Sequence, residues 1–195
     1  MILFDLGAVL VDASFNDLAA RLSLPLDREQ MRAKWLASAA IRDFETGAIG
    51  PKDFADRFVV EWDLCMTAES FAQAFTEWPR GPFPGAGSLV ARVRKRHRVG
   101  CFSNCNELHW QRFASFLDWF DVAISSHQTG YAKPAVEAFE AALANTNATA
   151  DEIWFFDDSP TNVDAARAVG IRSFVVRGVE QLESELVRQG LLGQA

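Results

Sequence analysis

Short apolar runs separated by helical patterns constrain the fold of this chain more than any other feature. Five runs are apolar along most of their length: residues 2–6, 98–102, 122–125, 153–156 and 173–176. Strands have this pattern when helices cover both faces of a parallel sheet. Apolar residues recur at helical spacing between the later runs, over residues 86–96, 107–117, 135–144 and 160–169. The alternation predicts right-handed βαβ units, and therefore an α/β fold with a Rossmann-like, doubly wound parallel sheet.

Residues 13–80 interrupt this alternation, because they show helical patterns and no convincing strand. Asp27 and Gln30 have the spacing of a capping box, in which side chain and backbone groups bond reciprocally at a helix start. Thr67 is a candidate N-cap for a later helix. The segment is therefore predicted to form a helical cap of about four helices, inserted after the first strand.

The boundary between cap and core is expected where proline and glycine are densest. Residues 80–85 read Arg-Gly-Pro-Phe-Pro-Gly, which interrupts helical and strand patterns alike. The predicted division is a core of residues 1–12 and 81–195 and a cap of residues 13–80.

The composition excludes several classes of protein. The 195 residues include 26 acidic and 19 basic ones, which gives a formal net charge of −7 at pH 7. This balance argues against nucleic acid and membrane surfaces as partners, because both are anionic. No apolar run approaches the roughly 18 residues of a spanning helix, and the three cysteines lack metal-ligand spacing. We expect a cytoplasmic globular protein, either a monomer or a homodimer, with no nucleic-acid or membrane partner.

Polar residues stand at or just beyond the ends of the predicted strands. They are Asp5, Ser103–Asn104, Lys133 and Asp157–Asp158. Ligands of open α/β sheets bind at the carboxyl ends of the strands. A carboxylate nucleophile, a hydroxyl, an amide, a lysine and an acidic pair are therefore expected to meet in one site.

Four segments resemble the ordered motifs of the haloacid dehalogenase superfamily. They are Asp5-Leu-Gly-Ala-Val9, Ser103-Asn104, Lys133-Pro134 and Phe156-Asp-Asp-Ser-Pro-Thr-Asn162. The helical insertion resembles that family's cap, so the likeness spans essentially the whole chain. The motifs and the cap stretch Phe44-Glu-Thr-Gly-Ala-Ile49 are most similar to the family's sugar phosphatases, of the α-D-glucose-1-phosphate phosphatase type. The resemblance implies a hydrolase that acts on a small phosphorylated metabolite, such as a sugar phosphate.

The same resemblance implies an aspartyl-phosphate mechanism that depends on Mg²⁺. Asp5 would attack phosphorus and carry the phosphoryl group. Asp5, the carbonyl of Gly7 and Asp158 would hold Mg²⁺, because hard oxygen ligands suit this cation.

The remaining motif residues would bind the substrate. Ser103 and the amide of Asn104 would hold a phosphoryl oxygen, with Lys133 as the positive clamp. Asp157 would support the site by orienting Lys133. Glu45, in the cap, would face the catalytic residues and contribute to substrate binding.

Gly7 departs from the family pattern. Phosphatases that this chain resembles carry an aspartate two residues after the nucleophile, which protonates the leaving group and then activates water. Glycine cannot transfer a proton, and such catalysis is typically worth about 10²–10⁴-fold. Three explanations stay open: a substrate with an easier leaving group, a substitute such as water, Asp12 or Glu45, and weak or absent activity.

Two alternative functions follow from these residues. A 2-haloacid dehalogenase would also use an aspartate nucleophile, but it would attack carbon without a metal and have little use for Asp157–Asp158. A non-catalytic ligand-binding protein on the same scaffold would account for Gly7, but not for Asp5, Lys133 and Asp158 together.

Overall fold

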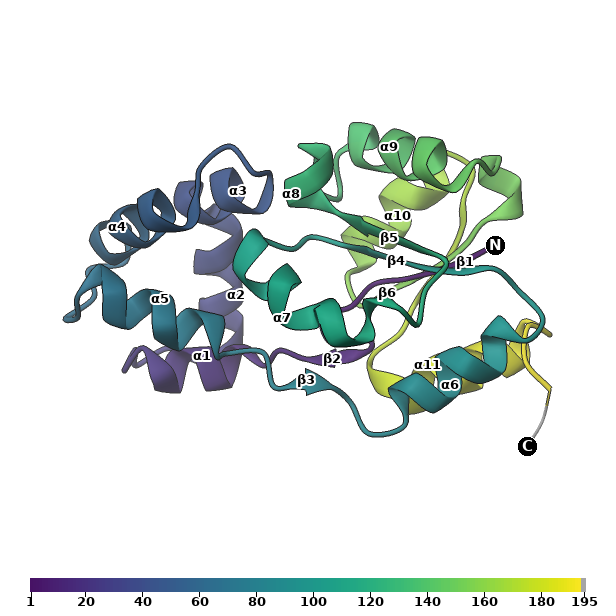
Figure 1. Ribbon diagram of the computed structural model, residues 1–195, viewed down its shortest axis with the longest axis horizontal. Helices are drawn as coiled ribbons and strands as arrows, with labels where there is room; N and C mark the ends of the chain where they lie inside the picture. Colours follow the sequence, from purple (N-terminus) through teal and green to yellow (C-terminus); the bar gives the residue numbers. More distant parts are fainter. Residues whose placement is uncertain (194–195) are drawn as a thin grey trace.

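In the computed structural model, which describes residues 1–193, a five-stranded sheet forms the centre of one half of the molecule (Figure 1). Its strands are β1 (Ile2–Phe4), β4 (Val99–Ser103), β5 (Val122–Ser125), β6 (Trp154–Asp157) and β7 (Arg172–Val175). They lie in the order β5-β4-β1-β6-β7, and every neighbouring pair is parallel. The predicted α/β fold with a parallel sheet is confirmed.

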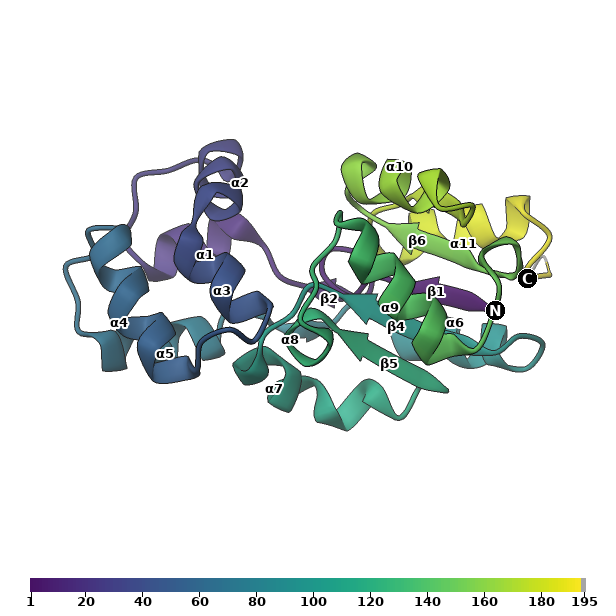
Figure 2. The same cartoon turned by 90° about the horizontal axis from the view of Figure 1, so that it is seen from above.

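Helices cover both faces of this sheet. They are α6 (Ala86–Arg94), α7 (Glu107–Leu117), α9 (Val136–Thr146), α10 (Pro160–Ala168) and α11 (Gly178–Arg188). Ile2 and Phe4 of β1 belong to one hydrophobic cluster with α6, α7 and α11. Leu3 points to the opposite face, because side chains alternate along a strand, and packs in a cluster with α9 and α10. The sheet therefore lies between two layers of helices (Figure 1), each packed on it through an apolar cluster. Figure 2 looks down onto the sheet from the side of α9.

Two core helices, α8 (Ser126–Thr129) and α11, were not predicted from the sequence patterns. Helix α8 has only 4 residues, which is too short for a helical periodicity. Helix α11 does carry a readable signal, because its buried Leu182 and Leu186 have helical spacing. A short 3₁₀ helix, η1 (Ala150–Glu152), precedes β6. Across residues 1–193, no helix is both long enough and apolar enough to cross a membrane.

The cap contains five helices, so the expected number of about four was too low. They are α1 (Phe15–Arg21), α2 (Arg28–Ala37), α3 (Ala39–Glu45), α4 (Pro51–Glu61) and α5 (Ala68–Thr76). Ser38 alone separates α2 from α3, and its Oγ accepts a hydrogen bond from the Ile41 N–H at 3.2 Å. One continuous apolar pattern therefore covers two helices. The capping box of Asp27 and Gln30 and the N-cap at Thr67 are confirmed.

Cap and core have separate hydrophobic clusters, joined by a narrow connection. The buried residues of the cap cluster all lie between Leu18 and Trp78. Strands β2 (Val11–Asp12) and β3 (Gly81–Pro82) pair antiparallel where the chain enters and leaves the cap. These observations support our proposed division at residues 12/13 and 80/81.

Stacked aromatic rings fill the cap interior. Phe44 stacks on Phe54 with ring centroids 4.2 Å apart, and Phe58 stacks on Phe71 at 4.4 Å. Phe54 is fully buried and also contacts the ring of Phe75 at 4.9 Å. Aromatic pairs in this range add stabilisation to the burial of their area. Phe54 is therefore the central residue of the cap core.

We predict that Phe54→Ala lowers the free energy of unfolding by about 3–5 kcal/mol, because it removes a buried ring and leaves a cavity. Val60→Ala on the same helix is the control, because Val60 is 79% exposed and its loss is expected to change stability by less than about 0.5 kcal/mol. Urea unfolding of both variants, followed by tryptophan fluorescence, measures the difference. Equal stability of the two variants would contradict the central position of Phe54.

Candidate active site

Lys133 joins two carboxylates from neighbouring strands at the carboxyl edge of the sheet. Asp5 directly follows β1 and Asp157 ends β6, whereas Lys133 lies in the loop between α8 and α9. The Lys133 Nζ donates to Asp5 Oδ1 at 2.8 Å and to Asp157 Oδ2 at 2.7 Å. It also donates to the carbonyl oxygen of Phe102, at the end of β4, at 2.7 Å. All the ammonium protons are therefore used, and Asp5 is held in one position.

The cluster contains more negative than positive charge. Asp5 is 7%, Lys133 4% and Asp157 0% exposed. Burial raises the pKa of Asp5 to about 7; Lys133 opposes this rise, and the carboxylates of Asp157 and Asp158 add to it. Burial by itself would lower the pKa of Lys133, but Asp157 and Asp5 outweigh that effect and raise it. Because one lysine faces three carboxylates, a further cation would be stabilised here.

The first turn of α10 fixes the Asp157 side chain. Its Oδ1 accepts hydrogen bonds from the Ser159 N–H at 2.8 Å and from Asn162 Nδ2 at 3.0 Å. Sequence reasoning assigned no role to Asn162, although this residue closes the last of the four motifs. Asp157 is therefore held between α10 and Lys133, which leaves Asp158 as the more accessible member of the pair.

The Asn104 side chain holds the lysine loop rather than pointing freely into the site. Its Nδ2 donates to the Lys133 carbonyl and its Oδ1 accepts from the Lys133 N–H, both at 2.8 Å. Only the main-chain N–H of Asn104 is left for a substrate oxygen. The adjacent Ser103 hydroxyl is buried, and its hydrogen bond to the Asn104 carbonyl is weak at 3.5 Å. Ser103 is therefore available to another acceptor.

Asp5, Gly7 and Asp158 are the residues predicted to hold Mg²⁺. A Cβ placed at Gly7 would lie 3.8 Å from Asp5 Oδ2, so the two residues are close. Asp158 is half-buried, and its nearest cation is Arg177, 3.8 Å away. Burial raises the pKa of Asp158, and the Asp157 carboxylate raises it further. Over residues 1–193 no three His, Cys, Asp or Glu side chains cluster closely enough to hold a metal. Two carboxylates with a main-chain carbonyl fit Mg²⁺, which keeps several waters.

The end of helix α3 brings Glu45 from the cap to this edge of the sheet. The Ser126 hydroxyl of α8 donates to the Glu45 carbonyl at 2.5 Å. Gly47 follows so closely that a Cβ there would lie 2.4 Å from the His127 carbonyl oxygen. Burial raises the pKa of Glu45 to about 7, with a further contribution from Asp5. Helices α3 and α8 lie side by side in both views (Figures 1 and 2).

Asp12 is the other residue predicted to replace the general acid that Gly7 cannot supply. Its contacts differ from those of Glu45. It lies in β2, 3.6 Å from the guanidinium of Arg80. The Arg80 N–H also donates to the Asp12 carbonyl at 2.9 Å. Asp12 is therefore part of the connection between cap and core.

The sequence model of the haloacid dehalogenase-like hydrolases matches residues 1–170 of this chain. The chain belongs to that family. The expected membership and the expected hydrolase class are confirmed.

The matches to similar proteins cover nearly the whole of this hydrolase. D-ribitol-5-phosphate phosphatase of Bacteroides thetaiotaomicron is 25% identical over 188 residues, which cover 89% of each chain. Phosphatase MT3486 of Mycobacterium tuberculosis is 27% identical over 199 residues, which cover 96% of this chain and 91% of that protein. The magnesium complex of a HAD family enzyme from Bacteroides thetaiotaomicron superposes with a TM-score of 0.75 at 22% identity, with 96% and 97% of the chains covered. This last likeness shows the fold alone.

A second polar contact between core and cap of the hydrolase involves His109, to which sequence reasoning gave no role. Its Nε2 donates to the carbonyl oxygen of Phe75 in α5 at 2.8 Å. Asn106 Nδ2 donates to the other ring nitrogen at 3.0 Å, which fixes this tautomer. Burial lowers the pKa of His109 to about 4, so the ring is neutral at pH 7. The histidine therefore fastens the cap and does not bind a metal.

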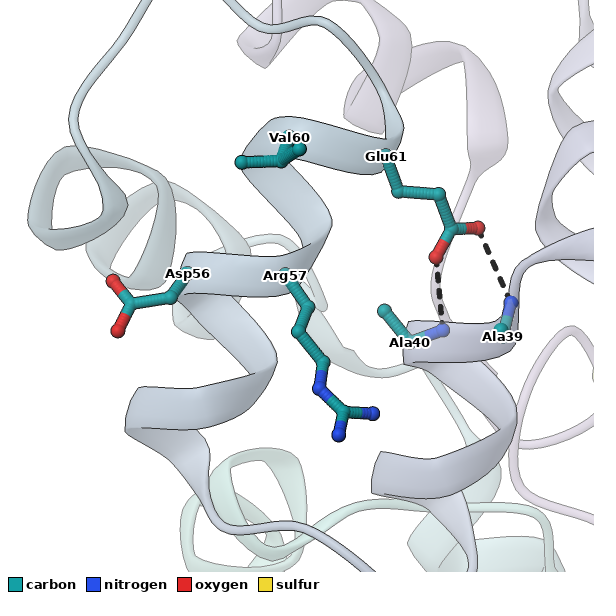
Figure 3. A pocket seen from close by; sticks show the side chains of 6 residues that line it. All are labelled: Ala39, Ala40, Asp56, Arg57, Val60 and Glu61. Carbon is teal, nitrogen blue, oxygen red and sulfur yellow. Dashed lines mark hydrogen bonds between the residues drawn. The ribbon is translucent and has the colours of Figure 1, made fainter.

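A hollow on the outer face of the cap is separate from this site. It has a volume of about 430 Å³ and lies between α3 and α4. Its lining consists of Ala39, Ala40, Asp56, Arg57, Val60 and Glu61. Figure 3 shows the Glu61 carboxylate bonded to the N–H groups of Ala39 and Ala40, at 3.2 and 3.0 Å. Glu61 thus caps the start of α3, and none of the candidate catalytic residues lies here.

We predict that Lys133→Met lowers the free energy of unfolding at pH 7 by about 3–5 kcal/mol, because two buried carboxylates lose their shared cation. The deficit is expected to shrink at pH 5, where protonation removes the repulsion between Asp5 and Asp157. Urea unfolding with a chelator present, at both pH values, measures the effect. Lys95→Met at an exposed lysine is the control. A deficit that grows at pH 5 would contradict the charge distribution described here.

Proposed function

We propose that this hydrolase is a Mg²⁺-dependent phosphatase of small phosphomonoesters, with a sugar phosphate as its substrate. The observation that carries the proposal is the buried Lys133, which holds Asp5 at the strand ends beside Asp157 and Asp158. The similar proteins named as phosphatases, one of them acting on D-ribitol 5-phosphate, support the choice of ester. Location in the cytoplasm and a monomeric or homodimeric state stay predictions.

In the proposed reaction, Asp5 is the nucleophile. Lys133 binds its Oδ1, so the attacking oxygen is Oδ2, on the side of Gly7. The Ser103 hydroxyl and the main-chain N–H of Asn104 bind oxygens of the phosphoryl group, and Lys133 adds positive charge beside them. Attack on phosphorus gives an aspartyl-phosphate, which water then hydrolyses.

Mg²⁺ would be held by Asp5, the carbonyl of Gly7 and Asp158. When bound, it supplies positive charge that neutralises the phosphoryl oxygens during transfer. The excess of carboxylates over lysine at this site supports its presence. Asp157 stays with Lys133 and keeps the lysine ammonium directed at Asp5.

The dehalogenase alternative is less well supported by the same geometry. An aspartate that attacks carbon needs no metal, so a dehalogenase reaction would give Asp158 no function. Asp158 forms one long ion pair, 3.8 Å from Arg177, so its carboxylate is less tightly paired than those of Asp5 and Asp157. Halide release from 2-haloacids, measured beside phosphate release, distinguishes the two reactions.

We predict that the wild type releases phosphate from a panel of sugar phosphates, nucleotides and aryl phosphates when Mg²⁺ is present. Asp5→Asn is expected to reduce turnover by on the order of 10³-fold or more, because an amide is a poor nucleophile. Circular dichroism checks that the variant stays folded. Turnover of Asp5→Asn at the wild-type rate would disprove the assignment of the nucleophile.

We predict that Asp158→Asn raises the Mg²⁺ concentration for half-maximal activity at least about tenfold, because it removes a charged ligand. Asp164→Asn is the control, since Asp164 lies on the neighbouring helix α10 with its side chain 74% exposed. Activity titrations with Mg²⁺ compare the two variants with the wild type. Coinciding titration curves would refute the role of Asp158.

A further inference from the structure

We propose that Glu45 of the cap transfers the proton that Gly7 cannot, and that Ser126 positions Glu45 for this task. The inference rests on the proposed phosphatase function. It names the residue that protonates the leaving group and then activates water, and it makes the cap a part of the catalytic machinery.

Gly7 lacks an acidic group, although the backbone conformation at this position does not require glycine. The Gly7 backbone does not adopt the left-handed conformation that favours glycine, and a Cβ there would meet only Asp5 Oδ2, at 3.8 Å. A Cβ would therefore be accommodated at this position, but glycine supplies no acidic group beside the nucleophile. A proton carrier must enter this space from another element.

The main chain of Glu45 is fastened to the part of the core that would bind phosphate. Its carbonyl accepts the short hydrogen bond of 2.5 Å from the Ser126 hydroxyl. The same hydroxyl oxygen accepts the Cys105 N–H at 3.0 Å. Cys105 lies in the loop that follows Ser103 and Asn104, so one hydroxyl links the cap to that loop. Gly47 also fits closely against the His127 main chain, which adds a second contact between this end of α3 and the core.

The charged groups that act on the Glu45 side chain belong to the candidate active site. The charges of Asp5 and Lys133 act on this carboxyl group. The Cys105 thiol lies within its electrostatic field as well. No arginine or lysine forms an ion pair with Glu45 within residues 1–193, so its carboxyl group is available to a substrate. Asp12, by contrast, is paired with Arg80.

The proton balance of the reaction closes with this residue. As Asp5 attacks phosphorus, the ester P–O bond breaks and its electron pair stays on the leaving oxygen. That oxygen takes the proton of the Glu45 carboxylic acid, which releases the alcohol and leaves a carboxylate. The carboxylate then removes a proton from the water that attacks the aspartyl-phosphate. Inorganic phosphate leaves, and Asp5 and the Glu45 acid are restored.

Single-turnover kinetics with two leaving groups test this role. Rapid-quench experiments with Glu45→Gln compare 4-nitrophenyl phosphate with the best alkyl phosphate of the panel. We expect the alkyl ester to be cleaved about 10²–10⁴-fold more slowly, because its alkoxide needs a proton. The aryl ester is expected to keep a burst of nitrophenolate near the wild-type rate, because this anion leaves without one. Slow hydrolysis of the phosphoenzyme should follow the burst.

Four further variants separate proton transfer from structural support. Glu45→Asp keeps a carboxyl group and should retain part of the alkyl-ester rate. Adding Gly7→Asp to Glu45→Gln should restore that rate to within about tenfold of the wild type. Ser126→Ala should slow the alkyl ester more than the aryl burst. Glu69→Gln, on the exposed side of α5, is the control and should change neither rate.

The outcomes discriminate between explanations. An equal loss on both esters would overturn the proposal, because it would indicate a structural role for Glu45. Unchanged cleavage of the alkyl ester by Glu45→Gln would overturn it too. If the wild type cleaves no phosphate ester, the proposed function fails, and this inference fails with it.

Discussion

The bonds of one buried ammonium group organise this molecule. Lys133 lies nearly out of contact with solvent and donates to Asp5, to Asp157 and to the Phe102 carbonyl, which belong to three adjacent strands. Burying a charge is unfavourable unless partners of opposite sign and hydrogen bonds compensate it. The ends of β1, β4 and β6 must therefore converge on the lysine, and this convergence brings together the side chains of the candidate active site.

The cap depends on the core for its position but has a hydrophobic cluster of its own. Leu108 and His109 of α7 pack against that cluster from the core. The bonds from Ser126 and His109 and the close contact of Gly47 help to hold the cap over the strand ends. The stacking of His109 on Phe75 and the bond from Arg112 to the Pro79 carbonyl add to them. Because Glu45 lies at one of these contacts, the bonds that hold the cap on the core also hold the proposed proton carrier at the site. Lids of this kind exclude water and commit the substrate.

The sequence predicted the residues whose position follows from strand order. Asp5 and Asp157 could be placed because parallel strands end at one edge, and the family motifs added Lys133. Contacts between distant segments were not predictable. The bonds of Ser126 to Glu45 and of His109 to Phe75 join residues 81 and 34 positions apart, and no periodicity encodes such a pairing.

Acid-quenched single turnover of the wild type with its best ester tests the central claim most directly. Peptide mass spectrometry of the quenched protein locates the phosphoryl group. Our account predicts that it is attached to Asp5. With 4-nitrophenyl phosphate, whose leaving group needs no proton, it should accumulate further in Glu45→Gln, because hydrolysis of the aspartyl-phosphate is slowed. Release of phosphate with no phosphorylated Asp5, or with the group on another residue, would contradict the account.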